Sequence, residues 1–218
     1  MPESTSRSPE RTVKQPSQRR VAGISMRDRL LNAAVESLIE KGIARTTTVE
    51  VQSRANTSRG ALLHHFASHA ELLSATVTEL VKRNEHGATL AHHKLANVAD
   101  PLERAIKTCA AIVKQPSYMA ELELWAVART DEELRASLLT AERAARADNL
   151  RVMSVVFEPL RDKPGYETVL ALTLEFARGL ALSDVLRASP RHKNKLLLEW
   201  VRAARILIDL PPEAKDKD

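Results

Sequence analysis

The sequence is poor in the residues that build disulfides, cofactor loops and membrane spans. Its 218 residues include one cysteine, six scattered glycines and seven aromatic side chains. A single cysteine forms no intramolecular disulfide and falls short of a thiolate metal cluster. There is no glycine-rich phosphate loop, and no run of about 18 apolar residues that would span a bilayer. We therefore expect a soluble globular protein with no cofactor and no membrane partner.

Cys109 and the first residues carry little chemistry of their own. Cys109 stands between Thr108 and Ala110 in an apolar helical pattern, which favours a small core residue over a reactive thiol. Residues 1–24 are rich in Ser, Pro, Arg and Gln and lack the apolar core of a secretory signal. We interpret this segment as a disordered basic arm on a cytoplasmic protein.

The charge is concentrated at one end of the chain. Residues 1–66 hold 11 Lys and Arg against 6 Asp and Glu, whereas residues 67–218 hold 22 of each. The whole net charge of +5 therefore lies in the first 66 residues. A basic end on a neutral body is typical of a protein that binds a phosphate backbone, although a solvated tail would show the same charge.

Apolar spacing and capping residues predict helices almost throughout, and no six-residue stretch alternates with the period of a strand. Caps are expected at Thr47 with Glu50, Ser58, Ser68 with Glu71, and Thr130 with Glu133, and Asn56 fits a tight turn between helices. The fold class is all-α, with about nine helices. They are expected at about 26–41, 48–55, 58–65, 69–85, 101–113, 117–128, 131–156, 166–188 and 190–209.

The last two of these helices carry more apolar residues than one buried face requires. Such a pair at the end of a chain indicates a self-complementary interface in a two-fold homodimer, or else a helix pair buried in the centre of one chain. The predicted dimer contacts are Leu170, Leu174, Ala181, Leu197, Trp200, Val201, Ala204 and Ile208.

Several histidines invite a metal or catalytic interpretation. His65 and His69 stand four apart, but the break at residues 66–68 separates them onto different helices, and no acidic third ligand follows. His92 and His93 lie near a helix end and are expected to face solvent. No nucleophile, base and orienting group occur at supporting spacings, so we predict no metal site and no enzyme. A histidine that donates to a DNA phosphate remains as an alternative.

The stretch from Met26 to Val77 resembles the N-terminal domain of the TetR family of bacterial transcriptional regulators. The resemblance rests on Ala33-Ala34 and Gly42 in the first helix, the threonine-capped second helix, and the motif Gly60-x-Leu62-x-His64-His65-Phe66 followed by Ser68 and Leu72. It implies a helix-turn-helix domain at 25–70 with helix four running on to about 85. A helical effector-binding and dimerisation domain at 86–210 and a short tail at 211–218 would follow.

This resemblance implies that the helix near 58–64 enters the major groove of a palindromic operator. Thr47 and Thr48 would contact phosphate at the start of the second helix. Ser58, Arg59 and Ala61 would lie nearest the bases, with Gly60 allowing close approach and His64 holding the backbone. Four positions depart from the family pattern and weaken these contacts: Leu63, His69, Ala61 and Val49. The basic arm, with Arg11, Lys14, Arg19 and Arg20, could add phosphate contacts instead.

The C-terminal part is expected to enclose an apolar effector pocket with a few polar anchors. The pocket candidates are Tyr118, Met119, Trp125, Met153, Phe157, Phe176 and Arg178, with Glu121 and Arg129 as further anchors; each could instead be ordinary core. The resemblance implies a ligand-responsive repressor that leaves DNA in the bacterial nucleoid when a small molecule binds. The alternative is a helical dimeric adaptor with a degenerate DNA-binding head. A single-strand binder is disfavoured because Phe66 is the only aromatic residue in the basic third.

Overall fold

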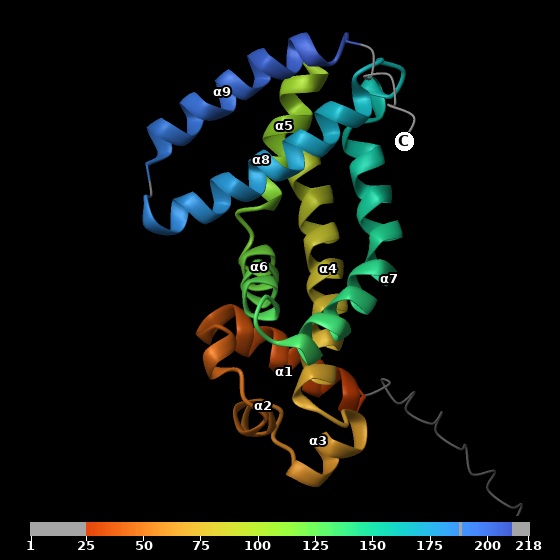
Figure 1. Cartoon of the computed structure of the whole chain (residues 1–218), viewed down its shortest axis with the longest axis vertical. Coiled ribbons are helices and arrows are strands. Elements are labelled where there is room, and N and C mark those ends of the chain that lie inside the picture. Colours follow the sequence, from red (N-terminus) through yellow and green to blue (C-terminus); the bar gives the residue numbers. More distant parts are fainter. Residues whose placement is uncertain (1–24, 188, 211–218) are drawn as a thin grey trace, which may run out of the picture.

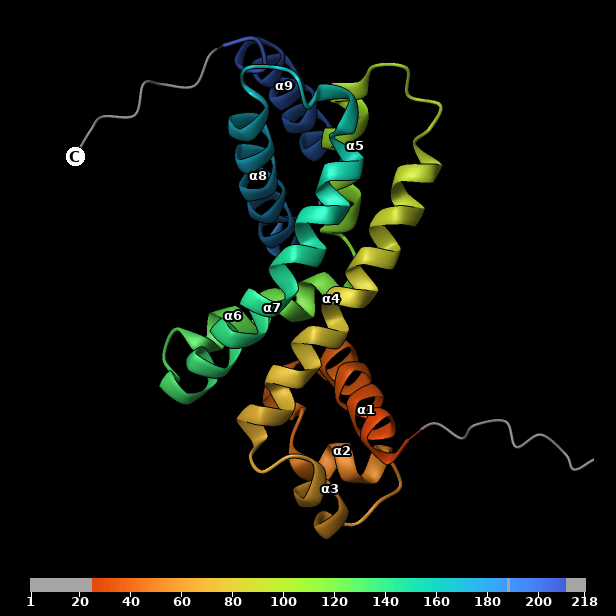
Figure 2. The same cartoon turned by 90° about the vertical axis from the view of Figure 1, so that its right-hand side faces the viewer.

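A computed structural model describes residues 25–187 and 189–210 of the chain. Within these ranges the protein consists of nine α-helices and two 3₁₀ turns without a strand, which confirms the all-α prediction (Figures 1 and 2). The basic arm at 1–24 and the tail at 211–218 lie outside the described residues. In chain order the elements are α1 (Met26–Lys41), η1 (Ile43–Arg45), α2 (Thr48–Arg54), α3 (Arg59–His65), α4 (His69–Lys94), α5 (Pro101–Ile112), α6 (Pro116–Ala128), α7 (Glu132–Val156), η2 (Glu158–Leu160), α8 (Tyr166–Leu186) and α9 (Pro190–Leu207).

Most helix starts follow the capping residues that the sequence predicts. The hydroxyls of Thr47, Ser58 and Ser68 each accept a hydrogen bond from the backbone N–H three residues on, at the starts of α2, α3 and α4. Asn56 takes a positive φ of 48° in the turn between α2 and α3. Gly42 ends α1 with a φ of 75°. Local hydrogen bonds therefore place the helix-turn-helix.

Three details of the helix limits differ from the prediction. Asp131 caps α7 by accepting from the Leu134 N–H at 2.9 Å, whereas the predicted cap Thr130 donates its hydroxyl to the Val127 carbonyl. Asp131 reaches the first turn because it is one residue nearer to it than Thr130. The Glu50 carboxylate pairs with Lys41 and Arg54 and so does not complete a capping box with Thr47. Helix α4 runs to Lys94 and not to about 85, and Gly87 lies inside it without a break.

The head formed by α1, α2 and α3 lies at one end of the molecule, where Figures 1 and 2 show it beneath α6 and the start of α4. Leu62 and Phe66 are buried there. They share a core with Leu30, Leu31, Ala33, Ala34, Val51, Ala55 and Leu72. Leu72 belongs to α4, so the long helix contributes its first turns to the core of the head.

Two further cores fill the rest of the molecule. The middle core joins α1, α4, α6 and the first half of α7, with Val77, Leu80 and Leu124 fully enclosed. The distal core joins α5, α8, α9 and the end of α7 around Ile106 and Phe157. Helix α4 packs along α7, and the two run side by side in Figure 1. No helix among residues 25–187 and 189–210 is long and apolar enough to cross a membrane.

Helices α8 and α9 form the pair that the sequence assigns to a dimer, and most of the predicted contact residues are already covered within the single chain. Five of those residues, Leu170, Ala181, Val201, Ala204 and Ile208, are buried in the distal core of the same chain. Leu174, Leu197 and Trp200 are half-buried against that core. Because α8 is apolar on most of its circumference, its periodicity does not reveal which face turns outward. The exposed apolar side chains are Leu172, Leu182, Val185, Leu186, Leu198 and Ile206.

Candidate DNA-binding surface and effector cavity

The first turn of α3 presents a short polar surface at the tip of the head. Ser58, Arg59 and Gly60 are exposed at the start of this helix, and Ala61 is partly exposed. The opposite face of the same helix is anchored because Leu62 and Phe66 are buried. A seven-residue helix held by one face and open on the other can enter a groove wide enough for an α-helix.

The remaining predicted DNA contacts lie on the head with different exposures. Thr47 and His64 are exposed, and Thr48 is partly covered at the start of α2. Two of the family departures leave large apolar side chains in solvent, since Val49 is 71% exposed and Leu63 is 47% exposed. Neither side chain supports the fold of the head. Both are free to touch an apolar group such as a thymine methyl.

Gly60 has open space around it. A Cβ atom built at this position would meet only the Ser58 hydroxyl, at 3.9 Å, and the residue does not have a positive φ. Neither packing nor backbone conformation therefore requires glycine here. What the missing side chain provides is a surface on which another molecule can approach the helix backbone.

The basic side chains of the head divide into two groups. Arg54 is held by Glu36, Glu40 and Glu50, and the pKa of Arg54 is raised mainly by its hydrogen bond to Glu40. By contrast, Arg45 and Arg59 have no ion pair or side-chain hydrogen bond with the described part of the chain. Arg59 is thus the charged group of α3 that is available to an external anion or to a guanine edge.

The histidines of the head do not form a metal centre. His65 ends α3 while His69 begins α4, as predicted. His69 Nε2 lies 2.7 Å from the Thr46 carbonyl oxygen, which only accepts, so this nitrogen carries the proton. His69 therefore ties α4 to the start of the helix-turn-helix. The described residues hold no group of three or more His, Cys, Asp or Glu side chains arranged for a metal.

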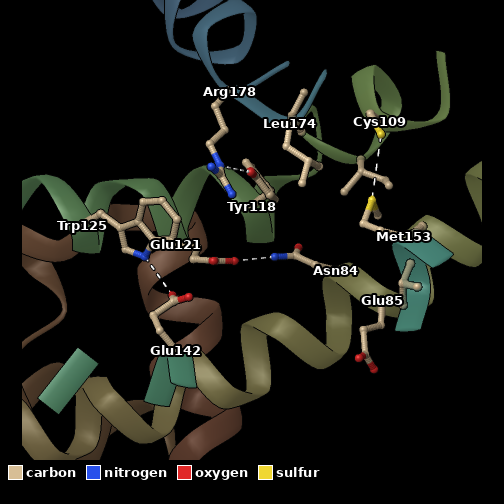
Figure 3. Close-up of a pocket in the computed structure, with 14 residues that line it drawn as sticks. Asn84, Glu85, Cys109, Tyr118, Glu121, Trp125, Glu142, Met153, Leu174 and Arg178 are labelled. Carbon is tan, nitrogen blue, oxygen red and sulfur yellow. Dashed lines mark hydrogen bonds between the residues drawn. The ribbon is translucent and has the colours of Figure 1, made fainter. Parts of the chain in front are cut away.

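The second candidate site is a cavity between α4, α5, α6, α7 and α8, of about 100 Å³ (Figure 3). Four of the predicted pocket residues line it: Tyr118, Trp125, Met153 and Arg178, together with the anchor Glu121. The sequence analysis missed Asn84, Glu85, Ala88, Cys109, Ile112, Val113, Glu142, Val152 and Leu174. Asn84 and Glu142 lie in the middle of long helices, where nothing in the local pattern distinguishes an inward polar residue.

Three predicted pocket residues and one anchor lie elsewhere. Phe157 is fully enclosed in the distal core, because the end of α7 turns away from the cavity. Phe176 stacks on Trp200 with ring centroids 5.5 Å apart. Met119 lies on the opposite side of α6 from the cavity, one position after Tyr118, and lines a separate groove beside Glu123. Arg129 is exposed at the end of α6.

A chain of hydrogen bonds crosses the floor of the cavity. Ser117 Oγ donates to Asn84 Oδ1 at 2.6 Å, and Asn84 Nδ2 donates to Glu121 Oε2 at 2.8 Å. Trp125 Nε1 donates to Glu142 Oε1 at 2.9 Å, so the indole is fixed against the second carboxylate. Figure 3 shows both carboxylates directed into the cavity. These bonds hold α4, α6 and α7 together through polar groups.

Glu121 is the most perturbed acid of this network. The pKa of Glu121 is raised from its ordinary value of 4.5 to about 7, chiefly by burial and also by the charge and hydrogen bonding of the neighbouring Glu142. Arg178 and the Asn84 amide act in the opposite direction. Glu121 therefore keeps its proton over most of the range below pH 7.

Arg178 closes the cavity on the side of α8. Its Nε donates to the Tyr118 hydroxyl at 2.9 Å, its Nη1 pairs with the exposed Glu175, and its guanidinium carbon lies 5.2 Å from the centre of the Trp125 ring. A guanidinium over an indole is a favourable cation–π contact. Beyond Arg178 lies an outer groove of about 510 Å³, which shares Glu142, Met153, Leu174 and Arg178 with the cavity.

The structure also tests the predictions for Cys109 and for the pair His92 and His93. Cys109 is buried, and burial raises the pKa of its thiol to about 12, so it stays protonated and is a core residue, as predicted. His93 is exposed, but His92 is partly covered and its Nδ1 is buried without a hydrogen-bond partner among the described residues. The prediction that both face solvent is therefore wrong for His92, which packs towards Arg104.

Helix α6 connects the cavity to the head. It carries Tyr118, Glu121 and Trp125 on one side and packs against α1 and η1 on the other. From that other side Glu123 Oε1 accepts a hydrogen bond from the backbone N–H of Ile43 at 2.8 Å. A displacement of α6 would therefore move η1, the segment between α1 and α2.

The fold and the head define a helix-turn-helix protein with a second, cavity-bearing helical domain. Residues 30–76 match the family described as bacterial regulatory proteins, tetR family. A helix-turn-helix transcriptional regulator of Mycobacterium tuberculosis is 31% identical over 110 residues, which are 50% of this chain and 56% of that relative. The regulator CymR of Pseudomonas putida is 28% identical over 190 residues, covering 87% of this chain and 91% of CymR.

Structural similarity extends over both domains. The multidrug binding protein EbrR, solved in complex with imidazole, superimposes with a TM-score of 0.58 at 19% identity, covering 88% of this chain and 99% of that one. EbrR has also been solved with ethidium. The likeness shows the shared fold. The head at residues 30–76 matches the TetR family of bacterial regulatory proteins, as the resemblance in its sequence indicates.

Proposed function

We propose that this chain is a transcriptional repressor that binds a specific palindromic DNA duplex as a homodimer and leaves it when a small molecule occupies the cavity. The observation that carries the proposal is the first turn of α3, where the unpaired Arg59 and the open Gly60 are exposed over a buried anchor. A helix presented in this way can place its N-terminal residues against base edges in the major groove.

The DNA surface combines one potential base contact with several phosphate contacts. Arg59 can donate two parallel hydrogen bonds to guanine O6 and N7, a contact that contributes roughly 1–3 kcal/mol of discrimination. Thr47 lies at the N-terminus of α2, where free backbone N–H groups favour a phosphate. His64 is exposed at the far end of α3 and can donate to the backbone. The contact set is small, so the arm at 1–24 is proposed to add phosphate contacts.

The dimer is proposed to form through the exposed apolar faces of α8 and α9. Leu172, Val185 and Ile206 are apolar side chains with 44%, 66% and 68% exposure in the single chain. Burying such side chains against a second copy removes apolar surface from water. An interface of this kind is self-complementary when the two copies are related by a two-fold axis, which matches a palindromic operator.

The effector part of the proposal rests on the cavity and on its connection to the head. The EbrR structures with imidazole and ethidium support a small-molecule site in a protein of this fold. In this chain, a ligand that moves α6 or α8 changes the Glu123–Ile43 contact and the position of the head. By linkage, the ligand shifts DNA affinity only as far as it binds the two states differently.

The alternative is a dimeric adaptor whose head no longer reads DNA. The exposed apolar side chains Val49 and Leu63 favour it, because they replace polar contacts of the family. An enzyme is not supported by the cavity, since Cys109, the thiol among the described lining residues, is kept protonated by burial, which raises its pKa to about 12.

Selection of binding sites from a random duplex pool distinguishes these functions. We expect the wild-type protein to recover a palindrome, and Arg59→Ala to lose or relax one base position in each half-site. Arg191→Ala, which removes an exposed cation from α9, is the matched control and should leave the motif intact. Binding that depends on salt but yields no motif contradicts specific recognition and favours the adaptor.

A further inference from the structure

The cavity is lined by more acidic than basic side chains, and this excess indicates which ligand the proposed effector site binds. Three carboxyl groups, Glu85, Glu121 and Glu142, and one guanidinium, Arg178, line it. Glu85 Oε1 lies 3.6 Å from Arg151 Nη2 of α7, and Figure 3 shows its carboxylate turned away from Glu121. The negative charge that remains for a ligand is therefore carried by Glu121 and Glu142.

Arg178 leaves this charge largely unneutralised. Its guanidinium contacts the Tyr118 hydroxyl, on the wall, and the exposed Glu175, outside the cavity. Neither Glu121 nor Glu142 receives a hydrogen bond from it; their donors are Asn84 Nδ2 and Trp125 Nε1. The repulsion between the two carboxyl groups is reduced while Glu121 keeps its proton, so the pair lacks a positive partner.

The aromatic wall of the cavity already holds a cation. The Arg178 guanidinium lies over Trp125, whose indole is fixed by its bond to Glu142. The electron-rich face of an indole attracts positive groups, and the attraction is larger when the contact is shielded from water. Tyr118 supplies a second ring edge and a hydroxyl at the same place. Trp125, Tyr118, Glu121 and Glu142 thus surround a position that suits a planar or compact cation.

The shape of the cavity fits a small head and a larger body. The inner space of about 100 Å³ holds only a compact group, whereas typical ligand pockets are roughly 300–1,000 Å³. The outer groove adds about 510 Å³ once Arg178 and the flexible Met153 move aside. Apolar side chains of Leu139, Leu150 and Leu170 line this groove, with Arg143 and Arg146 exposed at its rim, where solvent screens their charge.

We propose that the effector is an organic cation whose positive group lies on Trp125 beside the carboxylates of Glu121 and Glu142, displacing the Arg178 guanidinium towards Glu175. The apolar body of the ligand extends into the outer groove. This assignment rests on the proposed effector site and names the chemical class that the site takes. Without a ligand, the Arg178 guanidinium occupies the place of the ligand's positive group. Because Arg178 belongs to α8, its displacement by the ligand transmits binding to α8.

Binding of a cation releases the proton of Glu121 to solvent. Glu121 becomes ionised beside Glu142, and the cation offsets the added negative charge. The charged and titratable groups beside Glu121 are Glu142 on α7, Arg178 with Glu175 on α8 and Tyr118 on its own helix, while the Glu85 carboxylate on α4 is turned away from it. Affinity for a cation therefore rises with pH, by about tenfold for each pH unit below the pKa of Glu121. An anionic ligand shows the opposite dependence.

Three probes of one shape test the class on the full chain: benzamidine, benzamide and benzoate, which are positive, neutral and negative. We expect isothermal titration calorimetry to give an at least tenfold lower dissociation constant for benzamidine than for the other two. The dissociation constant of benzamidine should be about tenfold lower at pH 6.5 than at pH 5.5. Titration in buffers of different ionisation enthalpy should show proton release. Tighter binding of benzoate, or no binding of benzamidine at millimolar concentration, overturns the assignment.

Two variants that change the cavity in opposite senses keep the test independent of folding. Glu121→Gln should weaken benzamidine at least tenfold and remove the pH dependence, and Arg178→Gln should strengthen benzamidine because the resident guanidinium is gone. Glu133→Gln, an exposed glutamate on α7, is the matched control. Weaker benzamidine binding by Arg178→Gln overturns the displacement. Operator release is measured separately: a cation that fills the cavity without releasing DNA contradicts the proposed repressor function and leaves the ligand class standing.

Discussion

The carboxylate of Glu123 accepts a hydrogen bond from the backbone N–H of Ile43 at 2.8 Å, although the two residues are 80 positions apart. The same carboxylate approaches Gly42, where a Cβ atom would lie 2.9 Å from Oε1. One side chain of α6 thus fits against the junction between α1 and η1, two residues along the helix from Glu121 in the cavity. The contact joins the cavity-bearing helix to the segment that leads into the DNA-binding helices.

Removing this contact is expected to weaken communication between the two sites. In Glu123→Ala, operator affinity without ligand should change little, while the factor by which a cavity ligand lowers that affinity should fall at least fivefold. Coupling between two sites in proteins is typically 5–150-fold, so such a loss is measurable by fluorescence anisotropy of a labelled operator. Glu133→Ala serves as the control, and an unchanged factor in Glu123→Ala means that coupling takes another route.

Gly60→Ala separates DNA binding from folding. Since the added Cβ meets only the Ser58 hydroxyl at 3.9 Å, the variant should fold and should gain up to about 1 kcal/mol from its better helix propensity. The same Cβ blocks close approach of α3 to DNA, and we expect operator affinity to fall at least tenfold. Thermal unfolding and anisotropy give the two values. An unchanged operator affinity in Gly60→Ala would contradict a DNA contact at Gly60.

The exposed apolar face of α8 and α9 makes the oligomeric state sensitive to charge. Val185→Glu places a carboxylate where the proposed dimer buries an apolar side chain, once in each copy. Burying an unpaired charge is strongly unfavourable, so sedimentation velocity should show at least a hundredfold weaker association. Val155→Glu makes the same change at a similarly exposed valine of α7 and should keep the dimer. If Val185→Glu still sediments as a dimer at micromolar concentration, the interface lies elsewhere.

Stability should fall as pH rises towards neutrality, because of Glu121. Its pKa is raised from 4.5 to about 7 in the folded chain, so the folded state holds a proton that the unfolded state has released over this range. The stabilisation is complete below about pH 4.5 and is lost by about pH 7, which amounts to about 3 kcal/mol. In Glu121→Gln this loss should disappear. Urea denaturation at pH 5 and pH 8 measures it, and a wild-type protein equally stable at both values would rule out the buried acid as its source.

The helix-turn-helix head could be predicted from the sequence because its determinants are local. The Thr47 and Ser58 hydroxyls cap the starts of α2 and α3. Gly42 at the end of α1 and Asn56 after α2 adopt the positive φ values at which the chain leaves each helix. Each signal acts within about four residues, so one chain is enough to show it. The cap of α7 could not be predicted in this way, because Thr130 and Asp131 are neighbouring candidates and only the folded geometry decides between them.

The cavity and the dimer face could be predicted only in part. Trp125 and Arg178 were found because large aromatic and basic residues are conspicuous within helices. Asn84 and Glu142 were missed because their partners, Glu121 and Trp125, lie 37 and 17 residues away along the chain. Five of the predicted dimer contacts are buried within the single chain because α8 is apolar on most sides, and the packing of α5 and α9 then decides which face is buried. Such choices depend on tertiary structure and leave no periodic signal.

The single helix α4 places Leu72 in the core of the head and Asn84 at the cavity, with Leu80 in the core between them. At about 1.5 Å per residue, these 12 positions extend about 18 Å without a joint. A chimera that joins the DNA-binding head of one regulator to the body of a relative therefore has no suitable junction near residue 70. A working chimera must carry α1 through at least Val81 together with the α6 surface around Glu123, so specificity for DNA and response to ligand are inherited as one piece.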